Sequence, residues 1–108
     1  MSLTDKQRGE LDRCIRRGIK FLNKEKPGWT HVVDLRALNM KSMYSCVAGQ
    51  ALGTACWDHD VVLHNQIRYG FCPQWSISEH MESWAYLKQR WKEVIKEIRL
   101  ADRRKNDH

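Results

Sequence analysis

The fold is organised around residues 34–53, which read DLRALNMKSMYSCVAGQALG. This stretch is the longest run of apolar and small residues between two charged segments with helical patterns. Ser42 is placed to cap a helix, and Met43, Cys46, Val47 and Gln50 follow it at helical spacing. We therefore expect a short central helix near residues 43–55, against which both charged segments pack.

The small residues of this stretch are predicted to serve packing. Gly49 and Gly53 are four residues apart, and glycine costs a helix about 1 kcal/mol relative to alanine. We therefore expect another helix to cross closely at these two positions. Cys46 is interpreted as a small buried thiol, because free cysteine behaves as a small apolar residue; the alternative is a nucleophile.

The irregular segment 27–42 is predicted to be tied down by polar contacts. Gln50 should hydrogen-bond irregular backbone near Trp29 or Asp34, since a buried amide needs partners; a catalytic or ligand-binding role is the alternative. Trp29 follows the turn at Pro27 and is expected to cover the edge of the core. The predicted structural residues are therefore Trp29, Asp34, Cys46, Gly49, Gln50 and Gly53.

Residues 4–26 carry the pattern of an amphipathic helix. Thr4 and Gln7 have the spacing of a capping box, and Pro27 with Gly28 ends the pattern. An apolar face includes Leu11, and the opposite face is basic. The candidate binding residues on that face are Arg13, Arg16, Arg17, Lys20 and Lys24. The favoured interpretation of this face is a solvated outer surface. The alternative is a phosphate- or acid-binding ridge, because like charges at this spacing repel one another and oppose helix stability.

Residues 77–101 are predicted to form the second long helix. Ser76 and Glu79 have capping-box spacing, and Trp84 and Trp91 lie in an apolar stripe, so both should pack in the core. Trp57 and Trp75 lie outside the stripes and are better candidates for exposed contacts. Residues 102–108 form a basic tail, for which a solvated state and a phosphate anchor both stay open.

The connection 56–76 contains four residues of the types that bind zinc. These low-priority metal candidates are Cys56, His59, His64 and Cys72. Their spacing after the first Cys-x-x-His pair matches no familiar zinc finger, so the favoured interpretation is buried thiols and surface histidines, without metal or other cofactor. No spacing supports a nucleophilic cysteine with a histidine base.

Composition indicates a single domain over residues 1–108. The hydrophobic fraction is 42% and the charged fraction is 30%, as in globular proteins. No apolar run reaches the roughly 20 residues that span a bilayer, and the N-terminus lacks an apolar signal core. We therefore expect no membrane contact, and free thiols in a reducing cytoplasm. Five tryptophans leave room for an exposed aromatic patch, and hence for a homodimer or partner interface.

The net charge of +6 is unevenly spread along the chain. Residues 1–41 hold ten Lys and Arg against five Asp and Glu, residues 42–75 hold one against two, and residues 76–108 hold eight against six. The basic first segment and tail suit contact with nucleic acid or an acidic protein surface, and they also suit solubility alone.

A set of short motifs spans most of the chain in a fixed order. They are Arg17-Gly18-x-x-x-Leu22, Pro27-Gly28-Trp29, Val33-Asp34-Leu35-x-x-Leu38, Cys46-Val47-x-Gly49-Gln50-x-x-Gly53, Tyr69-Gly70-Phe71 and Leu87-x-x-x-Trp91. This pattern resembles small uncharacterised proteins encoded by phages of actinobacteria, such as mycobacteriophages. The resemblance implies a viral protein in the host cytoplasm, and it implies no activity.

The sequence therefore predicts a mainly α fold, with two long amphipathic helices packed around a short central helix and irregular connections. We expect a non-enzymatic phage accessory protein that modulates its host by binding a host protein or nucleic acid through the basic helical face. The alternatives are a DNA-binding regulator, and a small metal-binding protein that uses Cys56, His59, His64 and Cys72. Nothing in the chain resembles a nucleotide-binding loop or a hydrolase motif.

Overall fold

The computed structural model describes residues 3–73 and 81–106, and within these ranges the chain is helical and contains no β-strand. The mainly α fold predicted from the sequence is confirmed. In chain order the elements are α1 (Asp5–Glu25), the 3-10 turn η1 (Trp29–His31), α2 (Val47–Leu52), the 3-10 turn η2 (Cys56–Asp58), α3 (Asp60–Asn65) and α4 (Met81–Asn106).

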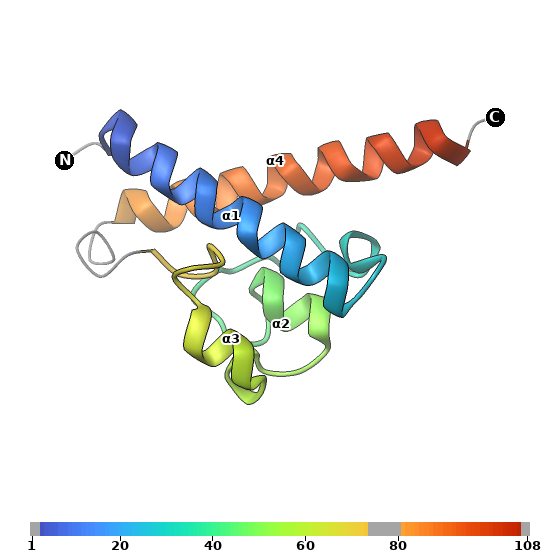
Figure 1. Ribbon diagram of the computed structural model, residues 1–108, viewed down its shortest axis with the longest axis horizontal. Helices are drawn as coiled ribbons and strands as arrows, with labels where there is room; N and C mark the ends of the chain where they lie inside the picture. Colours follow the sequence, from blue (N-terminus) through green and yellow to red (C-terminus); the bar gives the residue numbers. More distant parts are fainter. Residues whose placement is uncertain (1–2, 74–80, 107–108) are drawn as a thin grey trace.

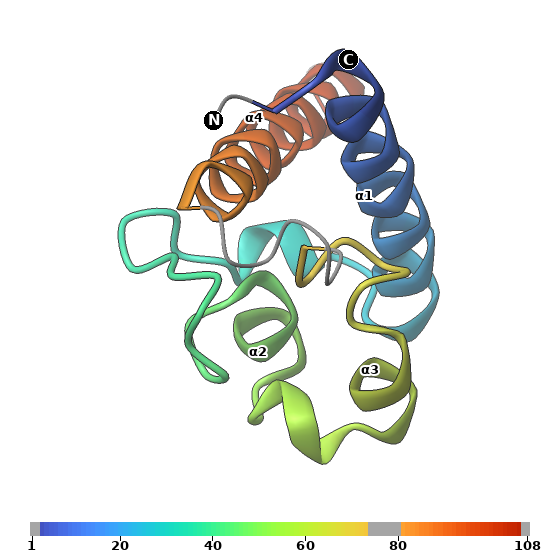
Figure 2. The ribbon, with the colours of Figure 1, turned by 90° about the vertical axis from the view of Figure 1, so that its left-hand side faces the viewer.

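The two long helices lie in one layer and the short elements lie beneath them. α1 and α4 cross each other and both run from left to right in Figure 1, while α2 and α3 lie below (Figures 1 and 2). The largest fully buried side chains come from both long helices and from η1. They include Trp29, Trp91, Leu11, Ile15, Leu22, Leu87 and Ile95. No helix in the described ranges is long and apolar enough to cross a membrane.

Local sequence signals set both ends of α1. The Gln7 amide donates to Thr4 Oγ1 at 3.1 Å and the Thr4 amide donates to Gln7 Oε1 at 2.9 Å, which is the predicted capping box. After Glu25 the chain turns through Gly28, whose φ of 81° is left-handed and favours glycine. The helix bounds lie within one residue of the predicted 4–26.

α2 is shorter than the predicted 43–55, and it begins differently. Cys46, not Ser42, is its N-cap: the Cys46 sulfur accepts from the Gly49 amide at 3.3 Å, while Ser42 accepts from the amides of a preceding turn. A side chain at Gly49 would overlap with the carbonyl oxygen of Met43, so the close neighbour there is a loop and not a crossing helix. Gly53 has open space around it and ends α2 with a left-handed φ of 70°.

The predicted polar ties around Gln50 are present. Gln50 accepts from the Asp34 amide at 2.6 Å and donates to the carbonyls of Asp34 and Ser45, so one amide holds the irregular segment against α2. Trp29 lies deeper than expected, because it is 1% exposed and its indole donates to Asn23 at 2.9 Å. α2 contacts η1 and η2; the packing of both long helices around it stays a prediction.

The Tyr69–Gly70 segment contacts both α1 and α4, which the sequence analysis did not predict. A side chain at Gly18 would overlap with the Tyr69 carbonyl oxygen, and one at Gly70 would lie 2.8 Å from the Ile15 amide nitrogen. The indole of Trp91 donates to the Gly70 carbonyl at 2.7 Å. The segment is therefore wedged between both long helices, and the glycines permit the approach.

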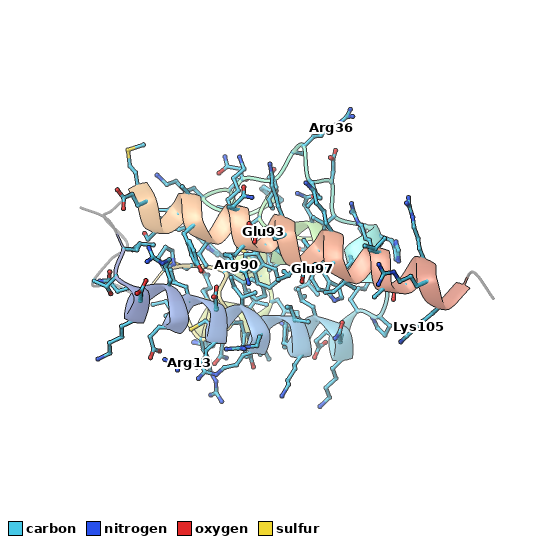
Figure 3. The ribbon with its side chains drawn as sticks, turned by 90° about the horizontal axis from the view of Figure 1, so that it is seen from above. Arg13, Arg36, Arg90, Glu93, Glu97 and Lys105 are labelled. Carbon is cyan, nitrogen blue, oxygen red and sulfur yellow. The ribbon has the colours of Figure 1, made fainter. Side chains whose placement is uncertain are left out.

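α4 begins at Met81 and ends at Asn106, five residues beyond the predicted end. The predicted residues 77–80 and the second capping box lie outside the described residues, as does Trp75. Arg90 faces α1 (Figure 3), and there its Nε donates to Asp12 at 3.1 Å, while Tyr86 donates to the same carboxylate at 2.9 Å. These contacts fix the crossing of the two helices.

Candidate binding groove between helices α1 and α3

The outer face of α1 carries exposed cations, as the sequence predicted. All five predicted binding residues are exposed, and Arg13, which projects from the outer edge of α1 in Figure 3, pairs with Glu10. Among the described residues, no carboxylate lies within ion-pair distance of the other four, which are Arg16, Arg17, Lys20 and Lys24.

These cations lie along one exposed face of α1, and the two edges of that face border different hollows. Arg13 and Arg16 line a small hollow toward α4, together with Asp12 and Arg90. Arg17 faces the other side, toward α3. Hollows on both sides of this basic face therefore include some of its cations in their lining.

Four cations gather at a hollow of about 410 Å³ on the α3 side of α1. They are Arg17, Lys20 and Lys24 from α1, and Arg68 from the turn after α3. Phe21 and Tyr69 also line the hollow, and their rings stack with centroids 4.8 Å apart. Arg68 is exposed, and no described carboxylate lies within ion-pair distance of it. Aromatic and aliphatic surface thus lies directly beside unpaired positive charge.

A larger hollow of about 920 Å³ continues from the first one. Its lining includes Arg17 and Arg68, which it shares with the smaller hollow, and the apolar side chains of Trp57, Leu63 and Ile67. Trp57 is 55% exposed and Leu63 is 45% exposed, which is high for such large apolar groups. We call the two hollows together the α1–α3 groove.

Two carboxylates border the α1–α3 groove, and both have cationic or polar neighbours. Glu10 lines the larger hollow and pairs with Arg13. Glu25 lines the smaller hollow, where His59 Nε2 lies 3.9 Å from its carboxylate. The electrostatic potential of the groove is therefore positive, because four unpaired cations face two partly compensated acids.

Burial determines the chemistry of the cysteines at and near this groove. Cys14 and Cys72 line the larger hollow, and burial raises the pKa of both thiols, although Arg17 acts in the opposite direction on Cys14. Arg17 also contacts the Cys14 sulfur at 3.8 Å. Thiols with a raised pKa are poor nucleophiles at neutral pH, so burial disfavours covalent chemistry at these two cysteines.

The four metal candidates do not come together. Cys56 is buried beside Cys46, and burial with this neighbour raises the pKa of Cys56 to about 12. His59 caps α3 by accepting from the Val62 amide at 3.4 Å, whereas His64 and Cys72 line the groove. Within the described ranges, no three His, Cys, Asp or Glu side chains form a group that could hold a metal ion.

Sequence reasoning identified part of the groove and missed the rest. Trp57 was expected to be exposed, and it lines the larger hollow. Arg68 was not singled out, although it is the only Lys or Arg in residues 42–75. The position of Arg68 as a lone cation beside apolar residues could have indicated a binding residue, since such a cation often makes a specific contact.

No family model matches the chain, and neither the curated proteins nor the solved structures contain a match.

Proposed function

We propose that this protein is a non-enzymatic accessory protein that acts by binding an anionic surface of a macromolecule in the α1–α3 groove. One observation carries the proposal: Arg17, Lys20, Lys24 and Arg68 converge on one groove without a carboxylate partner among the described residues. The resemblance to small phage proteins adds the setting, in which the macromolecule is a host protein or nucleic acid in the host cytoplasm.

Electrostatics explains why such a cluster favours a partner. Like charges at neighbouring helical positions destabilise a helix by a few tenths of a kcal/mol per pair. An anionic partner removes this repulsion and gains from several cations at once. At physiological salt the screening length is about 8 Å, so these charges act on a partner only at close approach. Positive potential over a hollow also raises the rate of encounter with acidic surfaces.

Paired charge reversals test the proposal. The test variant is Lys20→Glu with Arg68→Glu, and the control is Lys88→Glu with Lys96→Glu, two exposed lysines of α4 that do not line the groove. Both pairs change the net charge by the same amount, so they separate the groove from overall charge. Each tagged protein is used to capture partners from host lysate, with and without nuclease treatment.

The proposal predicts that the test variant loses the captured macromolecule while the control retains it. Loss of capture after nuclease treatment assigns the partner to nucleic acid, and a DNA-binding regulator then becomes the favoured function. Capture that survives nuclease assigns the partner to protein. The proposal is wrong if the test variant captures the same material as the unaltered protein in both conditions.

A further inference from the structure

We infer that the occupant of the α1–α3 groove is an acidic amphipathic helix of a partner protein. Its apolar face would lie in the larger hollow and its carboxylates beside Arg17, Lys20, Lys24 and Arg68. This inference rests on the proposed function and adds the chemical class of the partner. It follows from the apolar side chains of the groove, from the spacing of its cations, and from the two carboxylates at its border.

The exposed apolar side chains favour a protein partner. Trp57 is 55% exposed, Leu63 is 45% exposed and Val61 is 40% exposed, and all three lie in η2 or α3 and line the groove. Aliphatic side chains gain free energy by packing against other apolar side chains. Single-stranded nucleic acid instead requires successive exposed aromatic rings on which bases stack. Two of these three side chains are aliphatic, so they fit a hydrophobic helix face better than bases.

The cations of α1 have the spacing that a second helix can match. Arg17, Lys20 and Lys24 are separated by three and four residues, so they follow one line along the helix. Acidic residues at the same spacing on a helix alongside α1 would face them in turn. The α1 side of the groove extends from Glu10 to Glu25, which is roughly 22 Å at 1.5 Å per residue. This length accommodates about four turns of a partner helix.

The bordering carboxylates weigh against a continuous phosphate backbone. Glu10 lines the larger hollow and Glu25 lines the smaller one. A nucleic-acid strand carries a charge at every nucleotide, so a strand along the groove would meet both acids. A helical peptide can place neutral residues opposite Glu10 and Glu25 and carboxylates only opposite the cations. Charge complementarity therefore favours the peptide.

Three labelled probes test this inference by fluorescence anisotropy with the full chain. The first is a designed peptide of about 18 residues, with leucine on one helical face and glutamate on the other. The second is a scrambled peptide of the same composition, and the third is a single-stranded oligothymidylate. The apolar test variant is Leu63→Ser, and its matched control is Leu100→Ser, because Leu100 is 49% exposed on α4 outside the groove. The charge variant is Lys20→Glu with Arg68→Glu.

We expect the helical peptide to bind at least tenfold more tightly than the scrambled peptide. Leu63→Ser should weaken this binding about tenfold, because a leucine loses its apolar contact, and Leu100→Ser should leave it unchanged. The charge variant should weaken binding of the helical peptide as well.

Other outcomes overturn the inference in distinguishable ways. If the scrambled peptide binds equally well, or if only the oligothymidylate binds and Leu63→Ser has no effect, the helical partner is wrong and the proposed function survives. Concentration-dependent self-association that Leu63→Ser abolishes would assign the groove to a second copy of this chain. If no probe binds, the inference of a helical partner fails. If the charge variant binds every probe as tightly as the unaltered protein, the inference and the proposed function both fail.

Discussion

The substitution Gly18→Ala tests whether the Tyr69–Gly70 segment is wedged against α1. A methyl group at Gly18 would lie well under 3.0 Å from the Tyr69 carbonyl oxygen and 3.1 Å from the Trp91 ring. The nearest atom belongs to the backbone, so it cannot swing aside as the end of a flexible side chain would. Overpacking of this kind typically costs about 1–3 kcal/mol.

Gly9 supplies the control, because it lies in the same helix and a methyl group there meets no atom within 4 Å. Alanine is favoured over glycine inside a helix by about 1 kcal/mol. Gly9→Ala should therefore stabilise the protein by up to that amount. In Gly18→Ala the overlap with a backbone atom places the cost in the upper part of the overpacking range, about 2–3 kcal/mol. After the same gain of about 1 kcal/mol, we expect a net loss of about 1–2 kcal/mol.

The assay is urea unfolding followed by circular dichroism at 222 nm. A loss of this size lowers the urea midpoint by roughly 1 M if the slope is near 1–2 kcal/mol/M, while Gly9→Ala raises the midpoint. The reasoning is refuted if Gly18→Ala raises the midpoint as Gly9→Ala does, because the Tyr69 carbonyl then does not lie against α1.

Three further predictions concern the Trp91 indole, the Cys56 thiol and the Tyr86 hydroxyl. Trp91→Phe removes the indole donor to the buried Gly70 carbonyl and should lower stability by about 1–3 kcal/mol; an unchanged urea midpoint would contradict it. Burial raises the pKa of the Cys56 thiol to about 12. At pH 8 this thiol should therefore react with iodoacetamide on the order of 10³-fold more slowly in the folded protein than in the urea-unfolded protein. Mass spectrometry follows the reaction, and equal rates in the two states would exclude a protected thiol. Burial and the hydrogen bond to Asp12 raise the pKa of Tyr86. The protonated Tyr86 hydroxyl therefore stabilises the folded state below pH 10, and this contribution is lost as the pH rises through the folded-state pKa. Tyr86→Phe should therefore cost about 1 kcal/mol at pH 7 and progressively less at alkaline pH, and a pH-independent cost would refute the assignment.

Local signals predicted the parts of the fold that depend on neighbouring residues. The capping box at Thr4 and the Pro27–Gly28 turn place both ends of α1 correctly, because helix ends are set by hydrogen bonds within a few residues. Gln50 was also predicted correctly, since a polar residue among small apolar ones must find a partner. The apolar stripe of α4 correctly placed Trp91 in the core, whereas Trp84, predicted from the same stripe, is partly buried and packs against the core.

Contacts between distant segments could not be predicted in the same way. Gly18 occupies one position on an apolar helical face, and nothing in its sequence neighbourhood indicates that residues 69 and 70 approach it. The sequence likewise does not indicate that Arg99 donates to the carbonyls of Thr30 and Val33. Irregular backbone accepts hydrogen bonds wherever the fold leaves a carbonyl unpaired.

The groove itself combines both situations. The cations of α1 were predicted from helical periodicity, whereas the hollows that they line depend on where α3 and α4 pack against α1. Arg68 joins Arg17 only because the Tyr69–Gly70 segment packs against Gly18. A helix-by-helix interpretation therefore identifies half of the groove.

The most direct test of the α1–α3 groove is a map of backbone amide chemical shifts in the ¹⁵N-labelled protein during titration with the acidic helical peptide. We expect the largest changes to fall on Arg17, Lys20, Lys24, Leu63 and Arg68, with no comparable change on the outer face of α4. Changes concentrated on α4 or on Arg103, Arg104 and Lys105 would contradict this expectation, because binding would then occur away from the groove.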